Sequence, residues 1–237
     1  MTFIHENNYE PFPKLEVHNH KGMRFYENPE GLKYPSITTV LGRRPDKVKS
    51  LQEWRQRVGN EQANKISGKA ARRGTVFHNM VEDYLQNNTE TIDEYKQQNF
   101  LAYCMFGEAK SHLDECIHKI ILQETSMYSD KFEVAGRVDC IAEFNGGGLA
   151  VIDFKTTTMM KKREWMDDYF VQCAAYASMF EEHTGVPIPK VVIIMVSEDG
   201  EIQILEENTT DFYPSLQKAM SDFYENLDLD KLPCEGD

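Results

Sequence analysis

Helical periodicity dominates the first half of the chain. Apolar residues recur three and four positions apart over several stretches bounded by capping or turn residues. The predicted helices cover residues 36–42, 46–58, 61–86 (interrupted at Gly74) and 93–118. Ser36 is the predicted N-cap of the first helix, and Gly42 ends it. Before them, residues 15–18 and 23–26 alternate around a Lys-Gly turn and predict a small hairpin.

The pattern changes to that of a sheet after residue 119. Short runs rich in β-branched and aromatic residues alternate with turn signals, and two amphipathic stretches return to helical spacing. The predicted strands cover residues 120–128, 133–144, 149–155, 190–196 and 201–206, and the predicted helices cover 163–183 and 211–226. This order predicts an α/β core, residues 120–237, behind a hairpin and helical lobe, residues 1–119, both parts of one domain.

The composition is that of a soluble globular protein, with 41% hydrophobic residues. No apolar run is long enough to span a membrane, and the N-terminus lacks the pattern of a signal peptide. The five cysteines are widely spaced, form no CxxC pair and fit no zinc pattern. Free thiols in a reducing cytoplasm are therefore expected.

The charge is unevenly distributed. A net charge of −13 argues against nucleic acid as a partner, because phosphates are repelled by an acidic surface. Residues 43–73, however, hold ten basic and three acidic side chains, an excess of +7. Such a segment is a candidate phosphate-binding face, and Trp54 within it could stack on a base. An ordinary solvated helix surface is the alternative interpretation.

The stretch from Gly136 to Lys155 carries the strongest chemical signal. Asp139 and Asp153 each lie inside an apolar run of predicted strand, and Lys155 shares a face with Asp153. A buried carboxylate is unfavourable unless it is paired or binds a metal, and Mg²⁺ prefers carboxylates together with water and phosphate oxygens. Lys155 could orient or deprotonate an attacking water, or stabilise the transition state. The alternative is a structural Asp–Lys ion pair.

The two aspartates can share a metal only if the pairing of their strands is offset. A symmetric four-residue loop would place Phe144 opposite Leu149, and Asp139 and Asp153 would then face opposite sides of the sheet. The glycines at 146–148 can accommodate an offset or a bulge. We therefore predict an odd effective loop or a bulge in this hairpin.

These residues resemble the signature of the PD-(D/E)xK nucleases, in which an Asp is followed on the next strand by Asp/Glu-x-Lys. Asp139 matches the first part, and Asp153-Phe154-Lys155 matches the second. The motif is short, so its weight depends on further elements elsewhere in the chain.

Three such elements resemble the RecB-like branch of that superfamily. Gln172 and Tyr176 match a Q-x-x-x-Y motif on the helix after the hairpin and share one helical face. His78 ends a G-x-x-x-H element from the helical lobe. Glu124 stands on the preceding strand, where members often carry a helper glutamate. A packed histidine, an exposed strand glutamate and an ordinary amphipathic helix are the alternatives.

The resemblance extends in the right order over residues 33–197, to the mitochondrial genome maintenance exonuclease and its phage relatives. It rests additionally on Tyr34–Leu41 and on Leu51-x-x-Trp54-Arg55. It implies a restriction-endonuclease-like core, a central mixed sheet of about five strands flanked by helices, with a helical N-terminal lobe. Single-stranded DNA would thread between lobe and core, past the basic segment.

The same resemblance implies the residues of the site. The implied catalytic residues are Asp139, Asp153, Lys155, Glu124, Gln172 and Tyr176; the implied metal ligands are His78, Asp139, Asp153 and Phe154; the implied DNA contacts are Arg43, Arg44, Trp54, Arg55, Lys69, Arg72, Arg73, Ser36 and Thr38.

It further implies Mg²⁺ as cofactor, with Mn²⁺ able to substitute, and hydrolysis of single-stranded DNA from its ends. No iron–sulfur cluster is expected, because only Cys234 follows the Q-x-x-x-Y helix. We expect a monomer without membrane association in the cytoplasm of a bacterium or a phage-infected cell, acting in DNA repair or recombination with a replication or recombination protein as partner. A structure-specific or double-strand-processing nuclease of the same fold, and a non-catalytic DNA-binding module, are the alternatives.

Overall fold

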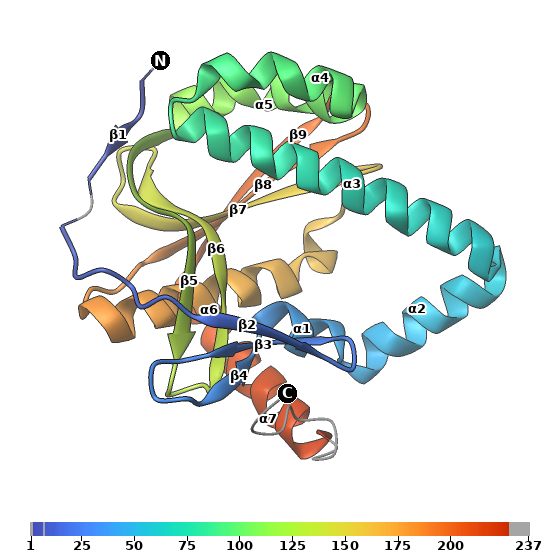
Figure 1. Ribbon diagram of the computed structural model, residues 1–237, viewed down its shortest axis with the longest axis vertical. Coiled ribbons are helices and arrows are strands. Elements are labelled where there is room, and N and C mark those ends of the chain that lie inside the picture. Colours follow the sequence, from blue (N-terminus) through green and yellow to red (C-terminus); the bar gives the residue numbers. More distant parts are fainter. Residues whose placement is uncertain (1, 7, 228–237) are drawn as a thin grey trace.

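The computed structural model describes residues 2–6 and 8–227 and centres on a six-stranded mixed sheet in the order β1-β5-β6-β7-β8-β9 (Figure 1). The strands are β1 (Ile4–His5), β5 (Ile117–Ser129), β6 (Val134–Phe144), β7 (Leu149–Thr157), β8 (Lys190–Ser197) and β9 (Ile202–Asn208). The helices are α1 (Ile37–Gly42), α2 (Pro45–Val58), α3 (Asn60–Leu85), α4 (Tyr95–Gln98), α5 (Phe100–Cys116), α6 (Asp167–Thr184) and α7 (Tyr213–Glu225), with short 3₁₀ turns η1 (Thr89–Glu94), η2 (Arg163–Trp165) and η3 (Thr209–Phe212).

The predicted mixed α/β core is confirmed. β7 and β8 are parallel, as are β1 and β5, and the other neighbours are antiparallel. The sheet exceeds the expected five strands because the two-residue β1 adds to its edge. Cys234, on which the argument about an iron–sulfur cluster depends, lies outside the described residues, and the division into a lobe and a core at residue 119 stays a prediction.

Helices cover both faces of the sheet (Figure 1). Ile152 of β7 and Ile194 of β8 belong to a core shared with α3 and α5, whereas Val151 and Ile193 belong to a core shared with α6 and α7. Because β7 and β8 are buried on both faces, their sequences are nearly continuous apolar runs. A polar side chain on either strand must therefore find a partner inside the protein.

A second, three-stranded sheet precedes the first helix. It consists of β2 (Glu16–His20), β3 (Met23–Glu27) and β4 (Lys33–Pro35), and its first two strands are the predicted hairpin. Ser36 caps α1, since its Oγ accepts a hydrogen bond from the Thr39 N–H at 3.1 Å. Both predictions for this region are confirmed.

Helix α2 and the first half of α3 form an arm that projects from the body (Figure 1). No residue of α2 is buried, and Leu51 is 53% exposed. The predicted interruption at Gly74 is wrong: α3 is continuous, because a glycine costs a helix only about 1 kcal/mol and packing offsets that cost. Within the described residues, no helix has the length and apolarity needed to cross a bilayer.

The hairpin between β6 and β7 has the predicted offset. Glu143 pairs with Leu149, and Cys140 with Ile152, one position away from the regular register. The ladder ends at the Cys140–Ile152 pair, and Asp139, the next residue of β6, accepts a hydrogen bond at Oδ2 from the Phe154 N–H at 3.0 Å. The predicted odd effective loop is therefore confirmed.

Backbone conformations in the connecting loop explain the offset. Asn145, Gly146 and Gly148 have φ values of 50°, 63° and 104°, and the Phe144 N–H donates to the Gly148 carbonyl at 3.1 Å. Asparagine tolerates the left-handed region, but a φ near 104° is reserved for glycine.

Gly148→Ala should lower the free energy of unfolding by about 1–3 kcal/mol, because alanine is strained at the φ of 104° that the loop requires. The added methyl group would meet no neighbouring atom, so a steric clash does not contribute. Gly147→Ala is the matched control: its φ is not positive, and its Cβ would lie 3.5 Å from the Phe144 carbonyl oxygen, an ordinary contact. Urea denaturation of both variants measures the difference. Equal losses would show that the loop does not depend on the conformation of Gly148.

Candidate active site

Three possible metal ligands converge from three elements. His78 lies in the second half of α3, Glu124 on β5 and Asp139 on β6. One ligand atom from each lies within 4.8 Å of the other two, and all three residues are half-buried. His78 Nδ1 is 3.4 Å from Asp139 Oδ2. Imidazole nitrogen and two carboxylates form a donor set that suits a divalent cation.

The backbone at Glu124 is strained. Its φ of 47° is in the left-handed region, although it lies within a strand and is not a glycine. Such a conformation costs on the order of 1–2 kcal/mol and tends to occur at functional sites. Burial, followed by the negative charge of Asp139, raises the pKa of Glu124 to about 7. The cluster thus concentrates negative charge that a cation would offset.

Asp153 and Lys155 form a second, more deeply buried group. The Asp153 side chain is 1% exposed and forms an ion pair with Lys155. Burial raises the pKa of Asp153, against the opposing charge of Lys155. Burial alone would lower the pKa of Lys155, but Asp153 and Asp139 outweigh burial and raise it. The lysine is therefore held in its charged form.

Asp139 links the two groups. Besides approaching His78, its Oδ2 accepts a hydrogen bond from the Phe154 N–H at 3.0 Å. Asp153, by contrast, lies outside the three-ligand cluster, and its oxygens contact Lys155 and Gln172. The predicted metal roles of Asp153 and Phe154 stay predictions.

Helix α6 packs on the face of the sheet opposite α3 and supports the buried pair of Asp153 and Lys155. Gln172 Nε2 donates to Asp153 Oδ1 at 3.0 Å and lies 3.3 Å from the Tyr176 hydroxyl oxygen. Tyr176 in turn packs against Gly136, where a Cβ would lie 2.7 Å from the Tyr176 ring. Glycine at 136 therefore permits α6 to approach β6, and the Q-x-x-x-Y pair reaches the aspartate.

Arg137 is a neighbour of the site that the sequence analysis missed. Its Nε lies 2.9 Å from Glu124 Oε2, and its side chain is 61% exposed. The signal was present in the sequence, because Arg137 precedes Asp139 by two positions on one strand and so shares its face. It provides a positive charge at the edge of the acidic cluster.

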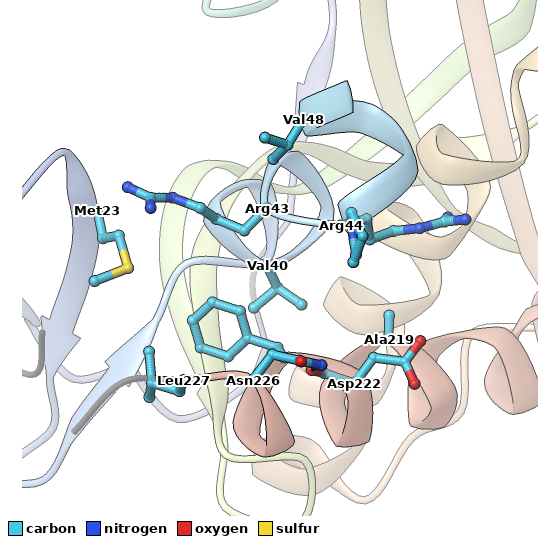
Figure 2. Close-up of a pocket in the computed structure, with 11 residues that line it drawn as sticks. Met23, Val40, Arg43, Arg44, Val48, Ala219, Asp222, Asn226 and Leu227 are labelled. Atoms are coloured by element: carbon cyan, nitrogen blue, oxygen red, sulfur yellow. Dashed lines mark hydrogen bonds between the residues drawn. The ribbon is translucent and has the colours of Figure 1, made fainter. Parts of the chain in front are cut away.

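The predicted DNA contacts lie around α1 and on α2 and α3. Arg43 and Arg44 leave the end of α1 in opposite directions, beside a cavity of about 200 Å³ between α1, α2 and α7 (Figure 2). Arg43 donates to the Lys21 carbonyl at 3.1 Å, and Arg44 forms an ion pair with Asp168. Ser36 is buried as a helix cap, and only Thr38 beside it is exposed.

The remaining predicted contacts lie on the arm. Lys69 and Arg72 are exposed, and Trp54 and Arg55 are half-buried. Arg73 differs, because it is 4% exposed and bonded to Thr156 and Glu198. The prediction of Arg73 as a surface DNA contact is therefore replaced by a structural role that joins α3 to the sheet.

Comparison with known proteins adds the family. The family model described as the PD-(D/E)XK nuclease superfamily matches residues 53–236. The solved "putative exonuclease" of Eubacterium rectale is 13% identical, with a TM-score of 0.46 over 65% of each chain, so less than two thirds of that protein is spanned. SSO0001 is 15% identical, with a TM-score of 0.36 over 65% of this chain and 86% of that chain. No curated protein matches the sequence.

Glu124→Gln should stabilise the metal-free protein near pH 8 but not near pH 4. The pKa of Glu124 in the folded protein, about 7, lies above its ordinary value of 4.5. Protonation therefore contributes stability that is complete below about pH 4.5 and is lost as the pH rises through 7. Glutamine stays neutral at every pH and retains this contribution, so near pH 8 the free energy of unfolding of Glu124→Gln should exceed that of the wild type by on the order of 1–2 kcal/mol.

Denaturation in the presence of EDTA at both pH values measures this gain, with the exposed Glu61→Gln as control. A pH-independent difference between Glu124→Gln and the wild type would contradict the raised pKa.

Proposed function

We propose that this chain, which belongs to the PD-(D/E)XK nuclease superfamily, is a metal-dependent DNA exonuclease of the RecB-like branch that digests single-stranded ends. Membership makes it a nucleic-acid hydrolase. The observation that carries the proposal is the offset hairpin, which sets Asp139 beside both the buried Asp153–Lys155 pair and the His78–Glu124 cluster.

The donor set fits a divalent cation, which we propose to be Mg²⁺, with Mn²⁺ as a substitute. His78, Glu124 and Asp139 would hold it, and the pKa of Glu124, raised by burial and then by the charge of Asp139, marks an ionised form that a cation would stabilise. Asp153 would join them if its contact with Lys155 loosens on substrate binding. A bound cation would supply Lewis-acid stabilisation of the scissile phosphate and activate a water molecule.

The residues of the chain divide the remaining tasks. Lys155 is held protonated by Asp153 and Asp139, so it is suited to stabilise negative charge on the phosphate rather than to deprotonate water. Gln172 fixes Asp153 by a hydrogen bond to Oδ1, which leaves the orientation of the ion pair defined. Tyr176 holds Gln172 in place.

The arm supports DNA as the substrate. None of the residues of α2 is fully buried. The helix carries several basic side chains and one partly exposed aromatic residue, Trp54. A helix without a packed face gains little stability from its surroundings, so a ligand surface is a reason for such a helix to project. Stacking on Trp54 together with phosphate contacts from Lys69 and Arg72 would hold a flexible single strand.

Lys155→Ala should lower the rate of digestion of single-stranded DNA by about 100-fold or more, because it removes the positive charge beside the phosphate. Strands labelled at the 5′ or the 3′ end and incubated with Mg²⁺ report both rate and polarity. Lys218→Ala, which removes an exposed lysine on α7, should leave the rate unchanged.

Two further measurements separate the proposal from its alternatives. Circular single-stranded DNA should remain intact, whereas cleavage of circles would indicate an endonuclease. Calorimetry should show Mn²⁺ binding to the wild type and its loss in Asp139→Ala. A wild type that binds DNA without Mn²⁺ binding or digestion would instead be a non-catalytic module.

A further inference from the structure

The face of α6 that carries Gln172 and Tyr176 continues one turn further toward the helix start. Tyr169 precedes Gln172 by three positions and Tyr176 by seven, so all three project from one side. Its ring is approached by Lys155, whose Nζ lies 5.2 Å from the ring centroid. Tyr169 therefore contacts the lysine of the proposed nuclease site.

A second lysine approaches the same ring. Lys161 Nζ lies 4.8 Å from the Tyr169 ring centroid and is hydrogen-bonded to the Tyr169 hydroxyl. Lys161 belongs to the connection between β7 and α6, six residues after Lys155. One aromatic side chain thus holds two ammonium groups, Lys155 inside the site and the half-buried Lys161 nearer the surface.

The connection that carries Lys161 is fixed at both ends. The Thr157 hydroxyl donates to the Met159 carbonyl at 2.8 Å, and Met166 is fully buried. Between them, Arg163 forms ion pairs with Asp167 and Glu207 and lies over the Phe170 ring at 4.2 Å. Lys161 is therefore held near the site rather than on a freely moving loop.

Lys161 also differs from its neighbours in its electrostatics. Arg163 has two carboxylate partners, and Lys162 has Glu164 at 3.9 Å. Lys161 has no carboxylate within ion-pair distance among residues 2–6 and 8–227, although the chain has 39 acidic and 26 basic residues. A half-buried ammonium that contacts only a phenol retains capacity to bind an anion.

We propose that Lys161 binds a backbone phosphate of the substrate strand next to the scissile one, and that Tyr169 is the positioning residue that sets the spacing between Lys161 and Lys155. The proposal rests on the proposed nuclease function and adds a substrate-binding position to it. The ligand is a nucleic-acid phosphate, recognised without regard to base.

A purely structural role is a weaker explanation. A partly exposed lysine on an aromatic ring contributes on the order of 0.5–1 kcal/mol to stability, and the connection is already held by Arg163 and Met166. Burying part of a cation without a carboxylate partner is justified more simply by an anionic ligand.

Lys161→Ala should raise the KM for a single-stranded oligonucleotide about tenfold and change kcat less than about twofold, because a charge-assisted contact made equally in the ground and transition states is lost. It should also reduce the slope of log affinity against log salt by about 0.7, the value for one phosphate contact with a single strand. Lys161→Arg should restore both quantities.

Lys162→Ala is the matched control. It removes the same charge one position away, from a side chain that is 70% exposed and contacts Trp165 instead of Tyr169. Its KM and salt slope should stay near those of the wild type. If Lys161→Ala and Lys162→Ala behave alike, the phosphate site is not at Lys161.

Substitution of Tyr169 separates the roles of its two contacts. Tyr169→Phe keeps the ring beneath Lys155 but removes the hydroxyl that bonds Lys161, so KM should rise while kcat is retained. Tyr169→Leu removes the ring from both lysines, so kcat should fall as well. A fall in kcat of equal size in both variants would contradict the positioning role.

The outcomes distinguish failure of this inference from failure of the proposed function. Binding is measured by fluorescence anisotropy of a labelled oligonucleotide with Ca²⁺ in place of Mg²⁺, which requires no hydrolysis. A wild type that binds but does not digest refutes the nuclease proposal, and the anisotropy comparison of Lys161→Ala with Lys162→Ala still decides the phosphate site. Digestion by the wild type with unchanged binding in Lys161→Ala refutes the inference alone.

Discussion

The site depends on the register in which β6 and β7 pair across one hairpin. Side chains alternate along a strand, so a shift of one position between β6 and β7 changes which residues of β7 lie beside Asp139. With Glu143 paired to Leu149, the Asp139 carboxylate accepts a hydrogen bond from the N–H of Phe154, the residue between Asp153 and Lys155. The glycine-rich loop is thus as much a part of the site as the carboxylates are.

The three carboxylates of the site, Asp153, Asp139 and Glu124, lie in two different electrostatic environments. Asp153 is fully buried and is matched by one lysine and one amide, so its surroundings are close to neutral. Asp139 and Glu124 lie nearer the surface with a histidine and the edge of Arg137, so negative charge remains in excess. In the proposed function, the second environment would attract a cation, and the charged lysine of the first would stabilise the phosphate. An acidic protein would in this way act on an acidic polymer.

Local patterns in the sequence were sufficient to predict most of this. Most helix and strand positions followed from periodicity, but the single helix predicted over 93–118 is wrong, because Asn99 is extended and caps a new helix, α5, that ends at Cys116. The offset followed from counting positions across the glycines, and the helical spacing of Gln172 and Tyr176 followed from the period of α6. What could not be predicted depends on contacts between distant segments. The approach of His78 to Asp139 was implied by the family resemblance alone, because the two residues are 61 positions apart and the packing of α3 on the sheet brings them together. The contact between Lys161 and Tyr169 required the path of an irregular connection, which no periodicity describes.

Arg73 shows most clearly why a count of charges is insufficient. Within the basic segment it is indistinguishable from Arg72, yet Arg72 is exposed and Arg73 is buried against Glu198, 125 positions away. Arg73 also donates to the Thr156 hydroxyl at 3.3 Å, on the residue that follows Lys155. It lies five residues before His78 on the same helix, so one side chain ties the base of the arm to β7. In the proposed function, α2 would meet the substrate without displacing His78, because the ion pair between Arg73 and Glu198 holds α3 in place between them.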